Sequence, residues 1–355
     1  MRDFEEKISF ISFSIFILFF TGCIQDEINY SFWQGDEQQT TQRTVSGTLA
    51  IADSLLLYEY FGMPHAIGLE KNGTNLYIKD NANNEIFIIE AKTLDHKGTI
   101  SPPVGQGPRE LTSLVSYDIY DGNVVINAGM NKIQTWNTDG DFIHEFLAEE
   151  LHPRRIRFRS DEKVVVLSKY FFVTEKSNLL HVINPEGKVE LGFGQVSEED
   201  YSSLKAEGYI LTDEEDNVYY SGYSEHILKK WDSEGNLIYS VASIDNHPST
   251  FNYATTEGES QRIMGYSEFA NYHSIGMAFL NEYWLILHGG IPVEPTYTPI
   301  LDIYNRNDGQ YLFSMELPYQ TSEIVSGDDY LYALHTIEDD IYLVFYDIQQ
   351  LEDHF

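Results

Sequence analysis

Short runs of β-branched and aromatic residues recur along the chain after residue 44, and polar residues and glycines separate them. Their first residues lie 48, 40, 54, 66 and 47 positions apart, and no helical period of about 3.6 residues extends across these intervals. Four short strands with their turns fill such an interval, which corresponds to one propeller blade. The pattern therefore predicts an all-β fold, a six-bladed β-propeller of four-stranded antiparallel blades over residues 44–355. The six runs are residues 76–78, 124–126, 164–166, 218–220, 284–286 and 331–333.

A finer signature repeats inside these units. Asp80 is followed three residues later by Asn83 and six residues later by Ile86, and the six-residue step to an isoleucine recurs in three other units. Several units then carry a turn that ends in glycine. Glycine supplies the positive φ that closes such hairpins, and Asn or Asp supplies local side-chain hydrogen bonds. The recurring steps run from Asn127 to Ile133, from Ser221 to Ile227 and from His335 to Ile341, and the turn glycines are Gly140, Gly187, Gly235 and Gly309.

These motifs resemble those of known propellers. The pattern D-x-x-N-x-x-I, followed by an aromatic residue and x-x-x-G, resembles the NHL-type repeat of six-bladed propellers. Residues 105–110 (GQGPRE) resemble the G-x-G-P-x-E segment of the TolB-like six-bladed lipoproteins of Bacteroidetes. The resemblance covers most of residues 44–353, although the Asp is replaced in blades 2, 4 and 6. It implies a propeller at the cell envelope and assigns no chemistry.

The two ends of the repeat region are each incomplete. The last unit has predicted strands near residues 322–328, 330–336 and 340–348 and lacks an outer strand, while residues 44–51 form an unassigned strand. Pairing the two would close the ring and cover two open edges. We therefore expect residues 44–51 to complete blade 6. Insertions are expected in blades 3 and 5, at about residues 169–178 and 289–298.

The N-terminus carries an uncharged run over residues 8–20, which is too short for a comfortable membrane span but fits the apolar region of a signal peptide. The following Phe20-Thr21-Gly22-Cys23 resembles the lipobox of bacterial lipoproteins, although Phe20 stands where Leu is usual. No polar face interrupts the run, which argues against a core helix that buries the cysteine. We expect residues 1–22 to be a lipoprotein signal peptide and Cys23 to be lipidated.

Residues 23–43 are mostly polar and lack periodicity, so we interpret them as a tether between the lipid and the propeller. Tyr30, Phe32 and Trp33 are candidates to dock part of it onto the body. Acidic residues directly after Cys23 resemble the surface-export signal of Bacteroidetes lipoproteins, and an ordinary acidic tether is the alternative. The expected location is the outer membrane, facing either the periplasm or the cell surface.

The charge excludes several classes of partner. The chain has 56 acidic and 22 basic residues, which give a formal net charge of −34. Nucleic-acid binding and attachment to anionic lipid both need basic faces, so neither is expected. A single cysteine permits neither an intrachain disulfide nor a cysteine-based zinc site. The 42% of hydrophobic residues indicates a folded chain, and we expect a monomer.

The sequence offers no complete catalytic motif: it lacks G-x-S-x-G, H-E-x-x-H and a Walker loop. Clusters of carboxylates, such as residues 213–216 and 338–340, are interpreted as solvated loops, since none has the spacing of a calcium loop. Residues 105–110 are interpreted as a tight turn between blades rather than a phosphate loop. We therefore predict no cofactor and no metal site.

One constellation could form a binding site at the channel mouth. His65 and His273 share the motif H-x-I-G, and each motif glycine lies eight residues before the hydrophobic run of its unit. Equal spacing suggests equal positions on inner strands, where side chains alternate between two faces. We expect both histidines at the channel with Glu207, and Arg109 and Arg154 nearby. The alternative is a channel filled by ordinary polar side chains.

The sequence thus predicts a lipid-anchored, non-catalytic propeller that binds an unknown envelope protein or a small ligand. A hydrolase or lyase with its site at the channel mouth is one alternative. A structural subunit of an envelope complex is another.

Overall fold

The computed structural model describes residues 32–57, 62–70, 73–148, 151–168, 177–197, 204–245, 251–255, 262–266, 272–289 and 299–354. The predicted signal peptide, Cys23 and Tyr30 lie outside these residues. From Phe32 onward the chain forms one compact unit.

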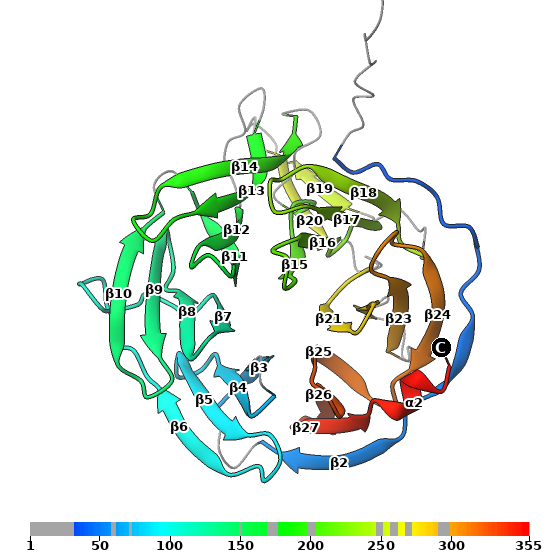
Figure 1. Cartoon of the computed structure of the whole chain (residues 1–355), viewed down its shortest axis with the longest axis horizontal. Helices are drawn as coiled ribbons and strands as arrows, with labels where there is room; N and C mark the ends of the chain where they lie inside the picture. The colour runs from blue at the N-terminus through cyan, green and yellow to red at the C-terminus, as the bar shows by residue number, and fades with distance from the viewer. Residues whose placement is uncertain are drawn as a thin grey trace, which may run out of the picture. The chain divides into compact units, whose positions relative to one another are not determined.

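Six β-sheets are arranged as blades around a central axis, which confirms the predicted six-bladed propeller (Figure 1). In each blade the first strand given below lies innermost and the last lies at the rim. Blades 1 to 3 are formed by β3 (Pro64–Leu69), β4 (Asn75–Asp80), β5 (Glu85–Glu90) and β6 (His96–Ile100); by β7 (Ser116–Tyr120), β8 (Asn123–Asn127), β9 (Lys132–Asn137) and β10 (Phe142–Leu147); and by β11 (Pro153–Phe158), β12 (Val164–Ser168), β13 (Ser177–Ile183) and β14 (Val189–Val196).

Blades 4 to 6 complete the ring. They are formed by β15 (Gly208–Thr212), β16 (Val218–Gly222), β17 (Ile227–Trp231) and β18 (Leu237–Ala242); by β21 (Gly276–Leu280), β22 (Tyr283–His288), β23 (Ile300–Asn305), β24 (Tyr311–Glu316) and β1 (Val45–Thr48); and by β25 (Gln320–Ser326), β26 (Tyr330–Ile337), β27 (Asp340–Asp347) and β2 (Ile51–Leu56). Outside the blades lie the hairpin β19 (Phe251–Thr255) and β20 (Arg262–Tyr266) and the short helix α2 (Gln349–Glu352).

The hydrophobic core is divided among the interfaces between blades. Each of six buried clusters joins two neighbouring blades, so every interface of the ring has its own packed layer. The second strands supply much of this packing, because they are buried on both faces: all five residues of β12 and of β16 are buried. This double burial explains why the second strands are continuous apolar runs in the sequence. The predicted turn glycines all have positive φ, between 71° and 85°.

The ring is closed by N-terminal residues, but not by those predicted. β2 pairs antiparallel with β27 and completes blade 6, with Leu55 opposite Leu343. β1, which falls within the predicted closing segment of residues 44–51, instead pairs parallel with β24 and adds a fifth strand to blade 5. The residues that close the ring therefore lie downstream of the predicted segment. The helix α2 follows β27 at the C-terminus.

Residues 32–43, which the sequence analysis assigned to the tether, run along the outside of blades 4 and 5 (Figure 1). Phe32 is buried in the cluster between blades 3 and 4 and stacks on Trp231 with ring centroids 6.1 Å apart. Asp36 bridges to Val241 on β18, and Arg43 forms two hydrogen bonds of 2.9 Å with Asp302 on β23. We call residues 32–44 the belt.

The inner strands of blades 3 and 4 run in the same direction. Arg154, at the start of β11, pairs with Glu207, just before β15. Thr212, at the end of β15, donates a hydrogen bond to the carbonyl of Phe158, at the end of β11. We call the face at which the inner strands begin the strand-start face. Because the strands of a blade alternate in direction, the second strand of each blade ends at this face.

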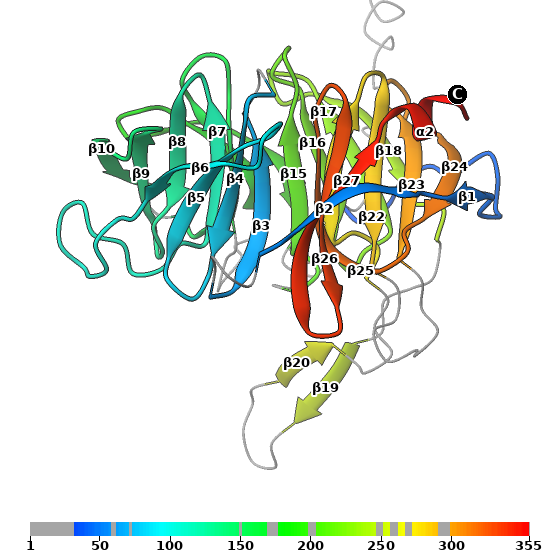
Figure 2. The same cartoon turned by 90° about the horizontal axis from the view of Figure 1, so that it is seen from below.

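The connections after β12 and β22, where insertions were predicted, leave strands that end at the strand-start face. So does the connection after β18, which contains β19 and β20. The hairpin β19–β20 extends from the disc on the side where β26 turns into β27 (Figure 2). Among the described residues, no helix has the length and apolar character needed to cross a membrane.

Candidate functional site: the central channel

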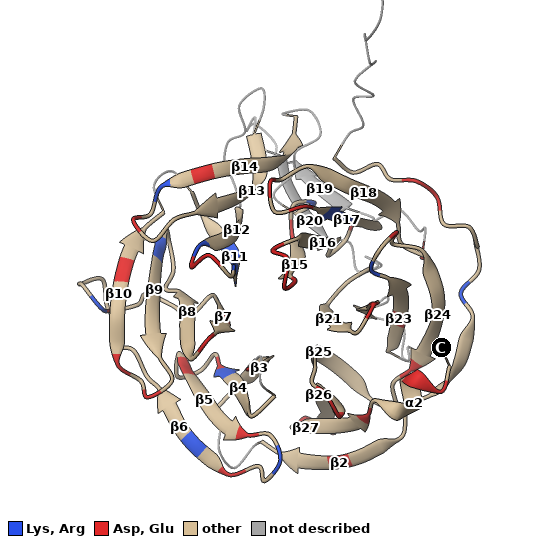
Figure 3. Cartoon of the chain, viewed as in Figure 1, with Lys and Arg blue, Asp and Glu red and all other residues tan. Residues whose placement is uncertain are grey.

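The inner strands of all six blades surround a cavity of about 780 Å³ on the propeller axis. Its basic side chains lie toward one end of that axis. Lys79, on β4, reaches the strand-start end, and so do Arg154 and Arg155, with Arg157 farther along β11. Figure 3 shows basic segments of β4 and β11 beside the channel. Four acidic lining residues lie where the inner strands end, namely Glu70, Glu214, Asp328 and Glu352, whereas Asp118 and Glu323 lie close to the arginines.

Backbone carbonyls and an aromatic ring position the basic side chains. Lys79 Nζ donates a 2.8 Å hydrogen bond to the carbonyl of Val115, and Arg155 Nε donates one of 2.6 Å to the carbonyl of Gly208. The Arg155 guanidinium also lies over the Tyr209 ring, 3.6 Å from its centroid. Such contacts hold the side chains in one orientation, so an anion entering here meets a preformed site.

Burial shifts the pKa values of two groups in the cavity. The pKa of Lys79 is lowered to about 8, mainly by burial; the nearby Arg155 and Arg154 also lower it, while Glu323 opposes the shift. Burial raises the pKa of Glu323 to about 7, although Arg155, Arg157 and Lys79 favour its ionised form. Lys79 is therefore mostly charged and Glu323 partly protonated near neutral pH. Both groups can change charge when a ligand binds.

Two of the five residues predicted for the channel mouth line the cavity. His65 lies on β3 and lines the strand-start end, where burial, Lys79 and Arg155 lower its pKa. Arg154 lines the same end, and its Nε lies 3.2 Å from a carboxylate oxygen of Glu207. Glu207 thus belongs to the rim as the partner of Arg154.

Arg109 lies elsewhere. Its backbone N–H donates to Glu145, and its guanidinium lies 5.1 Å from the centroid of the Phe142 ring, so it packs on the outer strand β10 of blade 2. The surrounding segment is a turn between blades 1 and 2, as expected, in which the Glu110 carboxylate accepts a 2.7 Å hydrogen bond from Gly107 N. The prediction that Arg109 lies at the channel is wrong.

His273 does not line the channel either. It is 2% exposed and lies between blades 4 and 5, with its ring 5.6 Å from that of His226. The equal spacing of the two H-x-I-G motifs did not give equal positions, because the hairpins β3–β4 and β21–β22 differ in length. Leu69 pairs with Leu76 across six intervening residues, whereas Phe279 pairs with Trp284 across four. The register therefore shifts, and His273 falls before the start of β21.

Lys79, Arg155 and Arg157 were not among the predicted site residues. A signal for the arginines was present, because residues 153–158 (PRRIRF) contain three arginines in a chain with only 22 basic residues. Lys79 carried no such signal, since its position in the cavity depends on how β4 pairs with β3.

No family model matches the chain, and no curated protein matches it. Solved structures do resemble it. A member of the DUF4221 family from Bacteroides vulgatus has a TM-score of 0.60 at 12% identity, covering 86% of this chain and 99% of that chain. A Bacteroides fragilis protein named "Putative exported protein" has a TM-score of 0.55 at 13% identity, covering 87% of this chain and 98% of that one. At these identities the comparison shows the fold alone, a propeller that this chain shares with two Bacteroides proteins.

Proposed function

We propose that this chain is a non-catalytic binding protein of the bacterial cell envelope that takes a small anionic ligand at the strand-start end of its channel. The proposal rests on one observation: four Lys and Arg side chains line the cavity, although the whole chain has a net charge of −34. Carboxylate, sulfate and phosphate groups are the natural partners of clustered Arg and Lys. The acidic far end of the cavity repels a second anionic group, so it favours a ligand with its charge at one end.

Binding of inorganic phosphate, measured by calorimetry at pH 6, tests the site. We expect Arg154→Gln to weaken binding about tenfold, as expected for the loss of one charge-assisted hydrogen bond. Arg109→Gln is the matched control, because it removes an equal charge that lies on the outer strand of blade 2. Lack of phosphate binding by the unaltered protein, or equal effects of the two variants, would overturn the proposal.

The pH dependence of sulfate binding supplies a second readout, because sulfate keeps its double negative charge over the range in which Glu323 and Lys79 titrate. As pH rises through about 7 Glu323 ionises, and as it rises through about 8 Lys79 loses its charge. Both changes disfavour an anion, so affinity should fall from pH 6 to pH 9. Lys79→Met should flatten the upper part of this profile. Affinity that rises over the same range would contradict a site built on these two groups.

The envelope location rests on the N-terminal sequence, whose FTGC motif ends at Cys23. The name of the Bacteroides fragilis neighbour is compatible with export. We infer an outer-membrane lipoprotein of the NHL- or TolB-like kind, in which an acylated cysteine gives a stable anchor.

Replacing the only cysteine tests the anchor. Cys23→Ala should move the protein from the membrane fraction to the soluble fraction, or leave an unprocessed precursor, because the acyl chains have no other attachment point. Fractionation and mass spectrometry of the mature N-terminus check this. Cys23→Ala protein that is cleaved and still fractionates with lipid would rule out the anchor.

A further inference from the structure

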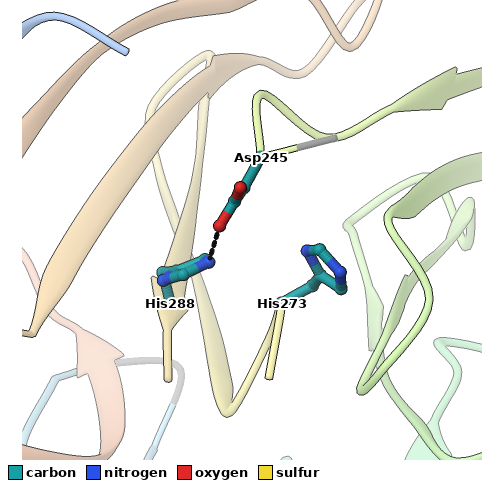
Figure 4. Close-up of side chains that lie close together, drawn as sticks. All are labelled: Asp245, His273 and His288. Atoms are coloured by element: carbon teal, nitrogen blue, oxygen red, sulfur yellow. Dashed lines mark ion pairs between the residues drawn. The ribbon is translucent and has the colours of Figure 1, made fainter. Parts of the chain in front are cut away.

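A second cluster of polar side chains lies between blades 4 and 5. Asp245 follows β18, His273 precedes β21 and His288 ends β22. Each offers one ligand atom, and the three atoms all lie within 4.8 Å of one another (Figure 4). The shortest separation is 2.6 Å, between His288 Nε2 and Asp245 Oδ2. None of the three lines the channel cavity.

Backbone contacts fix the chain at each of these residues. His273 N donates a 2.9 Å hydrogen bond to the carbonyl of Tyr223 in blade 4. His288 is paired with Ile300 in the ladder of β22 and β23. The residue before Asp245 donates its N–H to the hydroxyl of Tyr304 at 3.0 Å. The two histidines are only 2% and 4% exposed, so the three groups are held together in a largely dry site.

We propose that Asp245, His273 and His288 bind a divalent transition-metal ion, and that zinc fits this donor set well. Two imidazole nitrogens and one carboxylate oxygen form a common three-ligand set for zinc. Metal–ligand bonds of about 2.0–2.2 Å place tetrahedral ligand atoms about 3.3 Å apart, so small side-chain rotations bring the three atoms into range. A fourth position remains for water or another ligand.

The surrounding charges permit a cation here. Arg43 Nη2 lies 3.9 Å from Asp245 Oδ2, but the same guanidinium forms two hydrogen bonds of 2.9 Å with Asp302. Two carboxylates therefore face one guanidinium. The neighbouring His226 adds no positive charge at neutral pH, because burial lowers its pKa more than Asp245 raises it.

The positions of the ligands suggest what the metal does. Asp245 and His273 flank the insertion that contains the hairpin β19–β20, which extends from the disc (Figure 2). His288 belongs to blade 5 itself. A metal bound by all three would tie both ends of the insertion to the propeller, and closing a loop in this way restricts the unfolded ensemble.

Metal titration of the EDTA-treated protein tests the site. Cobalt(II) serves as the spectroscopic probe, because tetrahedral cobalt gives strong visible bands, and zinc should then displace one cobalt per chain. We expect His288→Gln and Asp245→Asn each to weaken zinc binding at least about 100-fold, since each removes a ligand. His96→Gln is the control, because His96 is exposed, lies in blade 1 and contacts Thr99 and the Phe87 ring rather than the proposed ligands.

A wild-type protein that gives no tetrahedral cobalt spectrum would overturn the proposal even if a variant fails to fold. So would a folded His288→Gln protein that binds zinc as well as wild type. Limited proteolysis tests whether the metal holds the insertion to the propeller. Zinc should slow cleavage within residues 246–271 in the wild type and in His96→Gln. It should leave the cleavage rate unchanged in Asp245→Asn.

Discussion

Replacing β2 (Ile51–Leu56) with a Gly–Ser run of equal length is expected to destabilise the propeller by about 5 kcal/mol. Two terms contribute: lost burial of Leu55 and Leu56, and the extra entropy that glycines must lose on folding, about 0.5–1 kcal/mol each. β2 is the fourth strand of blade 6, and without it the edge of β27 opens. Because natural domains are stable by only about 5–15 kcal/mol, the variant should be largely unfolded or melt at a much lower temperature.

β1 (Val45–Thr48) provides the matched control. It is also an N-terminal strand, but it is added to a blade that already has four strands, and three of its four residues are exposed. A Gly–Ser run in place of β1 should therefore cost less than about 2 kcal/mol. Urea denaturation of the two variants measures the difference. If the two replacements cost the same, β2 does not have the closing role that its pairing indicates.

The architecture could be predicted because each blade repeats one pattern. A second strand buried on both faces must be a continuous apolar run, which appears in the sequence at every blade. A hairpin with a positive-φ position favours glycine, which appears in blades 2 to 5. The exact closing strand could not be predicted from the same pattern. Residues 45–48 and 51–56 are adjacent short segments of strand character, and only tertiary pairing separates them. The three consecutive leucines Leu55, Leu56 and Leu57 were the useful signal in the sequence, and in the structure Leu57 is fully buried just after β2.

The channel site was harder to predict because it depends on register. A difference of two residues between hairpins moved His273 out of the inner strand, although its motif matched that of His65. The same shift placed His273 beside His288 and Asp245, which lie 15 and 28 positions away in the sequence. Residues that meet across a blade interface lie far apart in the sequence, so no short motif with a fixed spacing marks such a cluster. The basic residues of the channel, by contrast, include Arg154, Arg155 and Arg157. Three arginines so close together are conspicuous in a chain with only 22 basic residues, so the sequence alone could have indicated them.

Arg43→Met is expected to destabilise the protein by about 3–5 kcal/mol, because it removes one partner of a buried ion pair. The Arg43 guanidinium donates two hydrogen bonds of 2.9 Å to Asp302, whose side chain is only 2% exposed. Ser314 Oγ also donates to Asp302, at 2.6 Å, but a hydroxyl does not neutralise the carboxylate. Removing Arg43 therefore leaves a charge in a site that was desolvated for a pair, and it removes one of several contacts between the belt and blade 5.

Lys163→Met is the control for this effect. Lys163 also contacts two carboxylates, those of Asp161 and Glu190, each at 3.0 Å, but these carboxylates are 35% and 42% exposed, and we expect a cost below about 1 kcal/mol. Denaturation is measured in EDTA, so that any metal bound near Asp245 does not contribute. Combining Arg43→Met with Asp302→Leu should recover part of the lost stability, since the double variant buries no unpaired charge. Equal costs for the two single variants would mean that burial does not strengthen the Arg43–Asp302 pair, and the belt would then be held mainly by Phe32 and its backbone bridges.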